Sequence, residues 1–367
     1  MREKLKVAML GVGDITFLHY PAYQNFEHAE LALLCDLDKK LLKDRAKQWG
    51  VQKISTDYKE VLSDPDIDII EVNTPHHMHK KHVIDALKAG KHVACQKPIA
   101  TSVSDAAEMV DAAKKSTGRF RVLENFVFYP PYVMAKELIE AGEIGEPLTI
   151  RFKLGTSLFG SRWVPLKSEL WHLGESEKGM GQAVFDDGYH KLSLAMFFFG
   201  DIKEVKGYID RSFKYADAPA QLMWRYKNAE VLGSFDIALS LNLYTHSDYF
   251  PADEKVTITG SRGMIQLTRC TAQIMNEPAM ILYRDGKRYM FDDLETDWQS
   301  SFTAGIRDFP KAIKEGRETL LTGERAADIV SFAYALIIAA KKGEAVSPDT
   351  VTDDMVKNEL LKGGELS

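Results

Sequence analysis

A glycine turn directly after a short apolar strand most constrains the folds open to this 367-residue chain. Residues 4–10 are almost continuously apolar, as strands buried on both faces of a parallel sheet are. The residues that follow are Gly11, Val12, Gly13, Asp14 and Ile15. Glycines here permit a tight turn and let the backbone approach a pyrophosphate, which the N-terminus of the next helix attracts. We therefore expect Gly11, Gly13, Asp14 and Ile15 to bind a dinucleotide.

Strand and helix patterns alternate through the first 125 residues. Apolar strand patterns are predicted at 31–34, 68–72, 92–96 and 120–124, and helical patterns at 39–49, 58–62, 80–89 and 104–115. Strands alternating with helices are typical of a doubly wound parallel sheet. The sequence therefore predicts an α/β protein whose residues 1–125 form a dinucleotide-binding Rossmann domain.

An acidic residue follows the second predicted strand. Asp36 lies near the spacing at which a carboxylate binds the adenosine ribose 2′-hydroxyl in dinucleotide sites. A carboxylate at that position repels a 2′-phosphate, so it favours NAD over NADP. The alternative is that Asp36 only caps the helix at 39–49.

The ends of two further strands carry polar residues. Ligands of doubly wound sheets collect at the carboxyl ends of the strands. Pro98 biases the preceding lysine towards an extended backbone, directed into the crevice. The histidines between 76 and 82 have no cysteine or carboxylate to complete a ligand set, so no metal site is expected. The residues expected beside the cofactor at these two strand ends are Thr74, Pro75, His79, Gln96 and Lys97.

A second cluster of chemistry-bearing residues begins an apolar helical pattern. Asp186, Gly188 and His190 precede a run of leucine, alanine and phenylalanine that continues to Gly200. If the helix starts near Asp187, Asp186 occupies its N-cap, and His190 lies one turn later on the same side. Such a pair can supply an orientable acid and base, although an N-cap beside a satisfied histidine is the simpler interpretation.

The second half of the chain is predicted to be mostly strands. Strand patterns lie at 148–153, 204–210, 221–226, 231–240, 255–259, 264–268, 281–284 and 288–291, with helices at 130–141, 302–314 and 325–340. Asp285-Gly286 is a strong hairpin signal. We expect an α+β domain at 126–350, with a large, mostly antiparallel open sheet used for substrate binding and oligomerisation, and a frayed tail at 351–367.

Composition excludes several classes of partner. The net charge of −6 and pI near 6.0 argue against nucleic-acid binding. The opening residues lack a signal-peptide core, and no apolar run approaches the length of a membrane span. Cys35, Cys95 and Cys270 are odd in number and far apart, which disfavours disulfides and indicates a cytoplasmic protein.

The motifs together resemble the Gfo/Idh/MocA family of NAD(P)-dependent oxidoreductases, over nearly the whole chain. The matching segments, in order, are Gly11-Val12-Gly13-Asp14-Ile15 with His19 and Pro21-Ala22, Asp36, Thr74-Pro75 with His79, Ala89-Gly90-Lys91-His92-Val93, Lys97-Pro98, Gly142-Glu143-Ile144-Gly145, and Asp186 with Gly188 and His190. The resemblance implies a sugar, polyol or glycoside dehydrogenase that forms a homo-oligomer.

The resemblance also implies roles for individual residues. The family's E-K-P motif maps onto Gln96-Lys97-Pro98, and Lys97 and His190 would face the substrate hydroxyl, with Asp186 as the third catalytic residue. Gln96 replaces the motif's acid; without that negative charge the pKa of Lys97 should be lower. The residues that we expect to contact substrate are Asn125, Tyr129, Trp163, Trp171, Asp187 and His190.

The predicted reaction is hydride transfer from a secondary ring carbinol, such as C3 of a glucoside, to the nicotinamide of NAD. Two other functions use the same scaffold. One is an NAD-dependent glycoside hydrolase that acts through a transient keto-sugar. The other is a catalytically silent NAD-binding regulator, which the loss of the acid at Gln96 keeps open.

Overall fold

The computed structural model describes residues 3–156, 159–161, 182–210, 217–240, 244–250, 252–268 and 277–361. The chain divides into two compact units. The first comprises Met1–Asn125 with Ser301–Val330, and the second comprises Phe126–Ser300 with Ser331–Ser367. The sequence-predicted domains at 1–125 and 126–350 and the tail at 351–367 stay predictions, and the structure groups residues 301–330 with the first unit.

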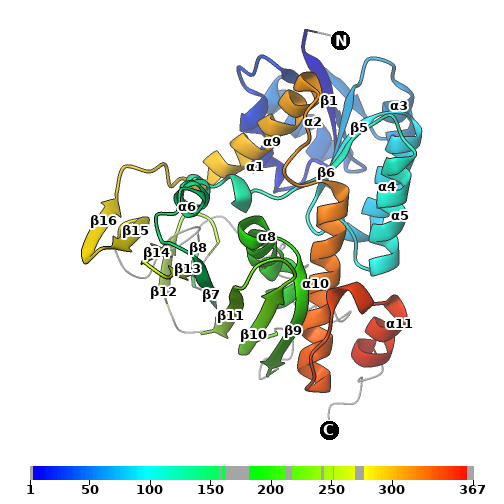
Figure 1. The fold of residues 1–367 in the computed structure, drawn as a ribbon. Helices are drawn as coiled ribbons and strands as arrows, with labels where there is room; N and C mark the ends of the chain where they lie inside the picture. Colours follow the sequence, from blue (N-terminus) through cyan, green and yellow to red (C-terminus); the bar gives the residue numbers. More distant parts are fainter. Residues whose placement is uncertain are drawn as a thin grey trace. The chain divides into compact units, whose positions relative to one another are not determined.

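The first unit is built on a six-stranded parallel sheet with the order β3-β2-β1-β4-β5-β6. This is the strand order of a doubly wound dinucleotide-binding fold. Helices α4 and α5 lie side by side on one face of it (Figure 1). The strands are β1 (Leu5–Leu10), β2 (Ala29–Cys35), β3 (Lys53–Ser55), β4 (Ile69–Val72), β5 (His92–Gln96) and β6 (Phe120–Leu123), and the helices between them are α1 (Thr16–His19), η1 (Tyr20–Tyr23), α2 (Lys39–Trp49), α3 (Tyr58–Ser63), α4 (His76–Lys88) and α5 (Val103–Lys114).

Residues 301–330 return to this unit through polar contacts with the sheet and with the first helical segment. The Val122 N–H of β6 donates to Leu321 O at 3.1 Å. The buried Arg121 guanidinium donates to Gly305 O at 2.8 Å, and Arg307 Nε donates to Ala22 O at 2.8 Å. These contacts bridge nearly 200 or more residues of sequence, which is why local patterns did not reveal them.

The second unit is built on an eight-stranded sheet with the order β16-β15-β14-β13-β7-β11-β10-β9. Its neighbours are antiparallel except β7 and β11, which are parallel. The predicted fold class is therefore confirmed. The strands are β7 (Pro147–Thr156), β9 (Ile202–Ile209), β10 (Ala220–Tyr226), β11 (Leu232–Leu239), β13 (Ala252–Gly260), β14 (Gly263–Leu267), β15 (Met280–Arg284) and β16 (Lys287–Phe291), with a separate pair β8 (Phe159–Ser161) and β12 (Tyr244–Ser247).

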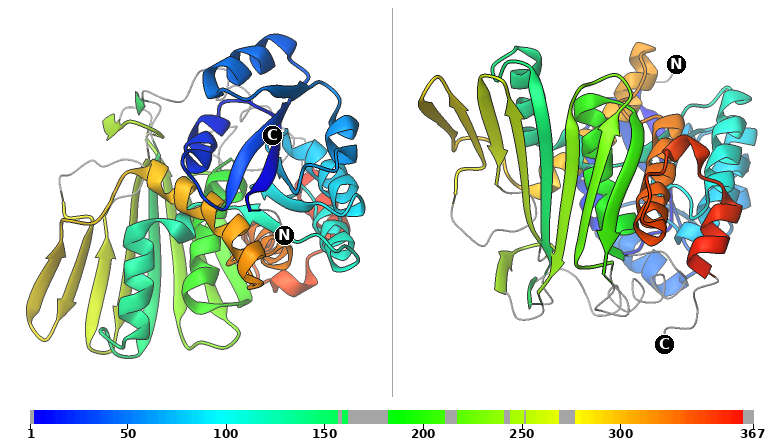
Figure 2. Two further views of the ribbon diagram at one scale, coloured as in Figure 1. Left: turned by 90° about the horizontal axis from the view of Figure 1, so that it is seen from above. Right: turned by 60° about the horizontal axis from the view of Figure 1, so that its bottom comes forward.

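One face of the eight-stranded sheet carries helix α8 (Asp187–Phe199) (Figure 2). The strands alternate buried and exposed residues, as a sheet covered on one side does. On the other face Tyr208 is 75% exposed, and Met223 and Leu232 are each 44% exposed. The remaining helical segments are η2 (Phe126–Phe128), α6 (Pro130–Glu140), η3 (Gln182–Asp186), α9 (Trp298–Glu315), α10 (Gly323–Lys342), η4 (Pro348–Thr350), α11 (Asp353–Val356) and η5 (Lys357–Leu361).

Two local predictions were wrong. Helix α4 begins at His76, four residues before the predicted start, because the Pro75 backbone is extended and ends the preceding strand connection. Residues 353–361 of the tail, which was predicted to be frayed, form α11 and η5, and the Thr352 side chain caps α11 by accepting a hydrogen bond from the Met355 N–H.

The inner face of the second sheet yields a packing prediction at Gly233. This glycine lies opposite Trp224, and a Cβ atom there would lie 2.1 Å from the buried indole ring. Gly233→Ala should therefore lower the free energy of unfolding by about 1–3 kcal/mol in chemical denaturation. Gly155→Ala, whose new Cβ would meet its nearest atoms at 3.8 Å, serves as the control and should change stability much less. Equal losses in the two variants would contradict the assignment.

Candidate active site

The glycine turn after β1 is closed on one side and open on the other. Gly11 has a φ of +86°, and its N–H donates to Cys35 O at 2.8 Å. A Cβ at Gly11 would lie 2.7 Å from Asn73 O, so only glycine fits there. A Cβ at Gly13 would meet nothing within 4 Å. The turn thus has free space at Gly13, as close approach of a pyrophosphate requires.

The Asp36 carboxylate is fixed beside this turn. Its Oδ2 accepts a hydrogen bond from the Val12 N–H at 2.9 Å, and its Oδ1 accepts one from the Asp38 N–H at 2.9 Å. The cap of α2 is Asp38, which accepts bonds from the Lys40 and Leu41 N–H groups. The interpretation of Asp36 as only a helix cap is therefore wrong, because the cap lies two residues later.

The neighbouring residues of the turn are also held by side-chain contacts. Thr16 stands where the third glycine of the G-x-G-x-x-G dinucleotide pattern would be. It is buried and donates its hydroxyl to Gly13 O at 2.6 Å. Asp14 lies 3.8 Å from the Arg45 guanidinium, and Ile15 precedes α1. These residues fit a dinucleotide: an open cradle at Gly13 and an oriented carboxylate at Asp36. Gly11, Gly13, Asp14, Ile15 and Asp36 remain the proposed cofactor contacts.

Lys97 follows β5 at the carboxyl edge of the same sheet, and its backbone is held on both sides. The Lys97 N–H donates to Gln96 Oε1 at 2.7 Å. The Lys97–Pro98 peptide bond is cis, and Pro98 O lies 3.0 Å from Nδ1 of His79. Nε2 of His79 lies 2.7 Å from Thr74 O. His79 therefore lies between the end of β4 and the segment that carries Lys97, and as a neutral ring it can donate to one of these two carbonyls.

The structure places the other strand-end residues as follows. The Thr74 hydroxyl lies 3.1 Å from Nδ1 of His82, and Pro75 precedes α4. His79 is fully buried, and burial lowers its pKa to about 4, although hydrogen bonds to Thr74 and Pro98 oppose that shift. Direct contact of Thr74, Pro75, His79 and Gln96 with the cofactor stays a prediction.

In the second unit, His190 lies in the first turn of α8, as predicted. Its ring is stacked on Phe126 with a centroid separation of 4.1 Å and an interplanar angle of 16°. His190 is 9% exposed. Asp186 precedes the helix, but its side chain makes no capping bond, because η3 already continues into α8. Asp186 therefore occupies the N-cap position of α8, as predicted, but without the side-chain hydrogen bond of a helix cap.

A buried ion pair lies next to His190 along α8. The ammonium group of Lys191 contacts the Glu254 carboxylate of β13, and both side chains are nearly fully buried. Lys191 Nζ also stands 4.6 Å from the centroid of the Phe126 ring. Phe126 therefore contacts two consecutive buried residues of α8, and it restricts the plane of the His190 imidazole.

The predicted substrate residues are only partly described. Asn125 is buried and donates Nδ2–H to Ser301 Oγ at 2.8 Å, and the buried Tyr129 donates its hydroxyl to Thr296 O at 3.0 Å. Asp187 begins α8. Trp163 and Trp171 lie outside the described residues. Substrate contact by all five residues stays a prediction.

Sequence reasoning missed several buried polar residues around these positions. They are Glu71 in β4, Arg121 in β6, Tyr23 in η1, and the pair Lys191 and Glu254. Glu71 and Arg121 each interrupt an apolar strand, which is the signal that could have found them, and the other three carry no such signal.

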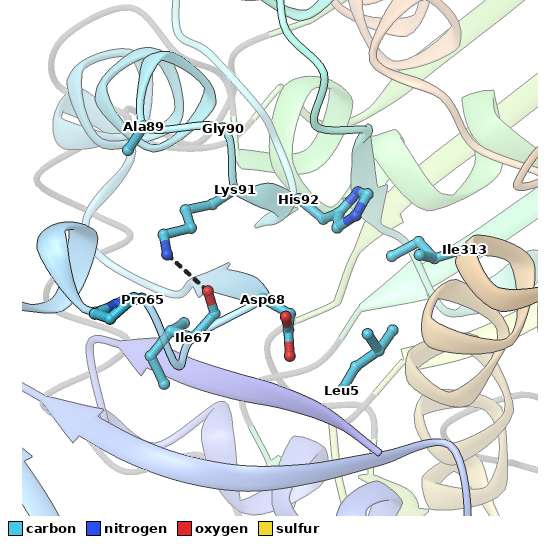
Figure 3. A pocket seen from close by; sticks show the side chains of 9 residues that line it. All are labelled: Leu5, Pro65, Ile67, Asp68, Ala89, Gly90, Lys91, His92 and Ile313. Carbon is cyan, nitrogen blue, oxygen red and sulfur yellow. Dashed lines mark hydrogen bonds between the residues drawn. The ribbon is translucent and has the colours of Figure 1, made fainter. Parts of the chain in front are cut away.

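A cavity of about 650 Å³ lies at the opposite, amino edge of the parallel sheet (Figure 3). Leu5, Asp68 and His92 line it from the starts of three strands. The Lys91 ammonium group donates hydrogen bonds to Asp64 O and Ile67 O, both at 2.7 Å. This cavity is therefore distinct from the carboxyl edge, where the glycine turn and Lys97 lie.

The described residues contain neither a metal-binding cluster nor a helix that could span a membrane. No group of three or more histidine, cysteine, aspartate or glutamate residues within them could hold a metal ion. No helix within them is long and apolar enough to cross a membrane. The cytoplasmic location and the absence of metal and nucleic acid stay predictions.

Comparison with known proteins identifies both parts of the chain. Residues 5–124 match the oxidoreductase family with an NAD-binding Rossmann fold, and residues 132–266 match the GFO/IDH/MocA C-terminal domain. The chain is 27% identical over 350 residues to D-apiose dehydrogenase of Rhizobium rhizogenes, covering 93% of this chain and 96% of that enzyme. It is 29% identical over 211 residues to levoglucosan dehydrogenase of Pseudarthrobacter phenanthrenivorans, and this match covers 55% of this chain and 53% of that enzyme.

A solved structure shows the same fold. Levoglucosan dehydrogenase in complex with NADH and levoglucosan superposes with a TM-score of 0.79 at 22% identity, covering 94% of this chain and 99% of that one. Residues 5–124 are therefore an NAD-binding Rossmann domain.

The two glycines of the turn should respond differently to alanine. Gly11→Ala places a methyl group against Asn73 O in a left-handed backbone, and should cost about 1–3 kcal/mol of stability in thermal or chemical unfolding. Gly13→Ala should leave stability within about 0.5 kcal/mol of the parent and raise the Kd for NAD about tenfold or more, because it fills the open space. Unchanged NAD affinity in Gly13→Ala would rule out this cradle.

Burial of neutral His79 predicts a pH-dependent stability. The folded-state pKa of about 4 lies below the ordinary value near 6.5, so the unfolded chain binds more protons between these values. The free energy of unfolding should fall as the pH drops from about 6.5 to about 4, by up to about 3 kcal/mol from this residue. His79→Gln should flatten that part of the stability curve, and the surface variant His28→Gln should not. If the free energy of unfolding fell equally steeply with pH in the parent and in both variants, His79 would not be the source of the pH dependence.

Proposed function

Because the chain belongs to the Gfo/Idh/MocA family of NAD-binding oxidoreductases, we propose that it oxidises a secondary ring hydroxyl of a sugar, glycoside or cyclic polyol to a ketone. NAD would be the oxidant, held by Gly11, Gly13, Asp14, Ile15 and Asp36. When bound, the nicotinamide supplies a hydride acceptor. The names of the two related dehydrogenases, which act on apiose and levoglucosan, support this substrate class.

The observation that carries the proposal is the placement of Lys97. It follows β5 at the carboxyl edge of an NAD-binding Rossmann sheet, where ligands of this fold collect. Gln96 Oε1 accepts a hydrogen bond from the Lys97 N–H, and His79 Nδ1 lies within hydrogen-bond distance of the Pro98 carbonyl. A lysine so anchored can donate a hydrogen bond to the substrate oxygen and stabilise the negative charge that develops there.

His190 is the proposed proton acceptor. An imidazole can take a hydroxyl proton near neutral pH, and the stacked Phe126 ring holds its plane. Asp186 lies one helical turn before it and would orient His190 or hold an adjacent hydroxyl. Asn125, Tyr129, Trp163, Trp171 and Asp187 are proposed to shape the substrate site.

The finer parts of the proposal concern position and assembly. We propose C3 of a glucoside as one substrate position, and a homo-oligomer formed through the face of the eight-stranded sheet opposite α8, where Tyr208, Met223 and Leu232 are exposed. A panel of sugars, glycosides and cyclitols, followed by absorbance at 340 nm with NAD or NADP, identifies the substrate. Product analysis then gives the oxidised carbon.

The panel also separates the two other functions of this scaffold. Net NADH release upon substrate addition marks a dehydrogenase, and glycoside cleavage without net NADH marks a hydrolase that re-reduces its keto-sugar. NAD binding without turnover of any compound marks a regulator.

The roles of Lys97 and His190 give a direct prediction. Lys97→Ala and His190→Ala should each lower kcat/KM by about 10²–10⁴-fold, because each removes a group that handles the proton or charge in the transition state. The Kd for NAD should change far less than kcat/KM, because the glycine turn and Asp36 are proposed to supply most of the cofactor contacts. Lys80→Ala and His28→Ala, which replace the same residue types elsewhere, are the matched controls. Normal turnover in both site variants would mean that the site is wrongly assigned.

A further inference from the structure

The parallel sheet of the first unit encloses a carboxylate, that of Glu71 in β4, which is fully buried. Its Oε1 lies 2.8 Å from Nδ1 of His19 and accepts a bond from Asn73 Nδ2 at 2.8 Å. Its Oε2 accepts a bond from the Tyr23 hydroxyl. The Tyr23 hydroxyl and the Asn73 amide both donate to this carboxylate, which favours its ionised form. Glu71 therefore stays an acceptor at neutral pH.

The second ring nitrogen of His19, Nε2, contacts the side-chain amide of Gln96. Nε2 of His19 lies 3.2 Å from Gln96 Nε2, and Gln96 Oε1 accepts the bond from the Lys97 N–H. Because a backbone N–H can only donate, it fixes the amide oxygen of Gln96 towards Lys97 and the amide NH₂ towards His19. An NH₂ group also only donates, so Nε2 of His19 must present a lone pair. The single proton of His19 is then on Nδ1, where it is donated to Glu71.

We propose that Gln96 is a positioning residue that keeps buried His19 neutral, with its proton on Nδ1, and holds the backbone of Lys97 at the same time. The importance for turnover rests on the proposed role of Lys97. The hydrogen bonds run from Lys97 through Gln96 and His19 to Glu71, and join the ends of β5 and β4 to α1.

A glutamate at position 96 would change this arrangement by one proton. Its carboxylate could still accept the Lys97 N–H, but it offers no donor to Nε2 of His19. One proton taken up from solvent would place a hydrogen on Nε2 and make His19 an imidazolium between two carboxylates, those of Glu71 and residue 96. The residue at position 96 thus decides whether Nε2 of His19 faces a hydrogen-bond donor or an acceptor.

The other groups around His19 do not supply that proton. Tyr23 of η1 faces Glu71, and burial raises the pKa of its phenol well above the usual value. The Arg121 guanidinium of β6 interacts electrostatically with Tyr23 and Glu71, and it lies 3.7 Å from the Asp308 carboxylate of α9. Phe302 of α9 presents an aromatic ring 5.6 Å from the imidazole centroid.

Nitrogen-15 NMR of the full-length protein with labelled histidine tests the proton assignment without substrate. The His19 signal is assigned by its loss in His19→Gln. At pH 7 the parent should show one bare nitrogen, Nε2, and one protonated nitrogen, Nδ1. Gln96→Glu should show both nitrogens protonated. A proton on Nε2 in the parent, or no change in Gln96→Glu, would overturn the proposal.

Hydrogen exchange tests the positioning of Lys97, also without turnover. Gln96→Met keeps the side-chain length but cannot accept the Lys97 N–H, so exchange of that amide should become about tenfold faster. Tyr23→Phe removes a bond to the same buried network at the far side of Glu71, and should lower stability without exposing the Lys97 amide. Equal exchange in the two variants would reduce Gln96 to a merely structural role.

Kinetics on an oxidised substrate adds the functional readout. Gln96→Met should lower kcat by about 10–100-fold, because small displacements of a catalytic group cost this much. Gln96→Glu should retain more of kcat and change the pH profile, and Tyr23→Phe should leave kcat near the parent value. A parent that oxidises no sugar refutes the proposed function and leaves the NMR and exchange results to decide the role of Gln96.

Discussion

The buried carboxylate of Glu71 is the constraint around which the carboxyl edge of the parallel sheet is arranged. A charge without partners at that depth would cost several kcal/mol, so every group near it must supply a donor. The donors come from α1, from η1 and from the end of β4. Because His19 also reaches Gln96 in β5, the central strand ends and the helix after the glycine turn share one hydrogen-bond network.

This network explains how a glycine turn and a lysine far apart in sequence are held in one frame. The turn is fixed by the bond from the Val12 N–H to Asp36 and by the close approach of Gly11 to Asn73. Asn73 also donates to Glu71, and Gln96 binds the Lys97 N–H. The residues proposed to hold the cofactor and the lysine proposed to act on substrate therefore depend on the same rigid sheet edge, as precise catalytic placement requires.

The sequence predicted the helices and strands well, because apolar periodicity and glycine turns are local signals. The β5 strand and helix α2 have the predicted bounds, and the fold class is confirmed. Contacts between distant segments carry no local signal. The return of residues 301–330 to the first unit depends on Arg121 and Gly305, which are 184 residues apart. Helix α4 was placed too late because a histidine-rich stretch has weak apolar periodicity.

The candidate site was predicted only as far as residue types allow. Gly11 and Asp36 could be identified because their positions follow from the strand–turn–helix geometry. The hydrogen bonds of Gln96 could not, since an amide in a motif does not reveal which group each of its ends faces. Likewise, the stacking of His190 on Phe126 joins residues 64 positions apart, and no spacing rule predicts it.

The central proposal is that Lys97 and His190 act on one substrate oxygen. A crystal structure of the protein with NAD and an oxidisable sugar or cyclitol measures this directly. The account predicts that Lys97 Nζ and a ring nitrogen of His190 each lie about 3 Å from the same hydroxyl oxygen, beside the nicotinamide ring. A substrate hydroxyl at the nicotinamide that is contacted by neither residue would contradict it.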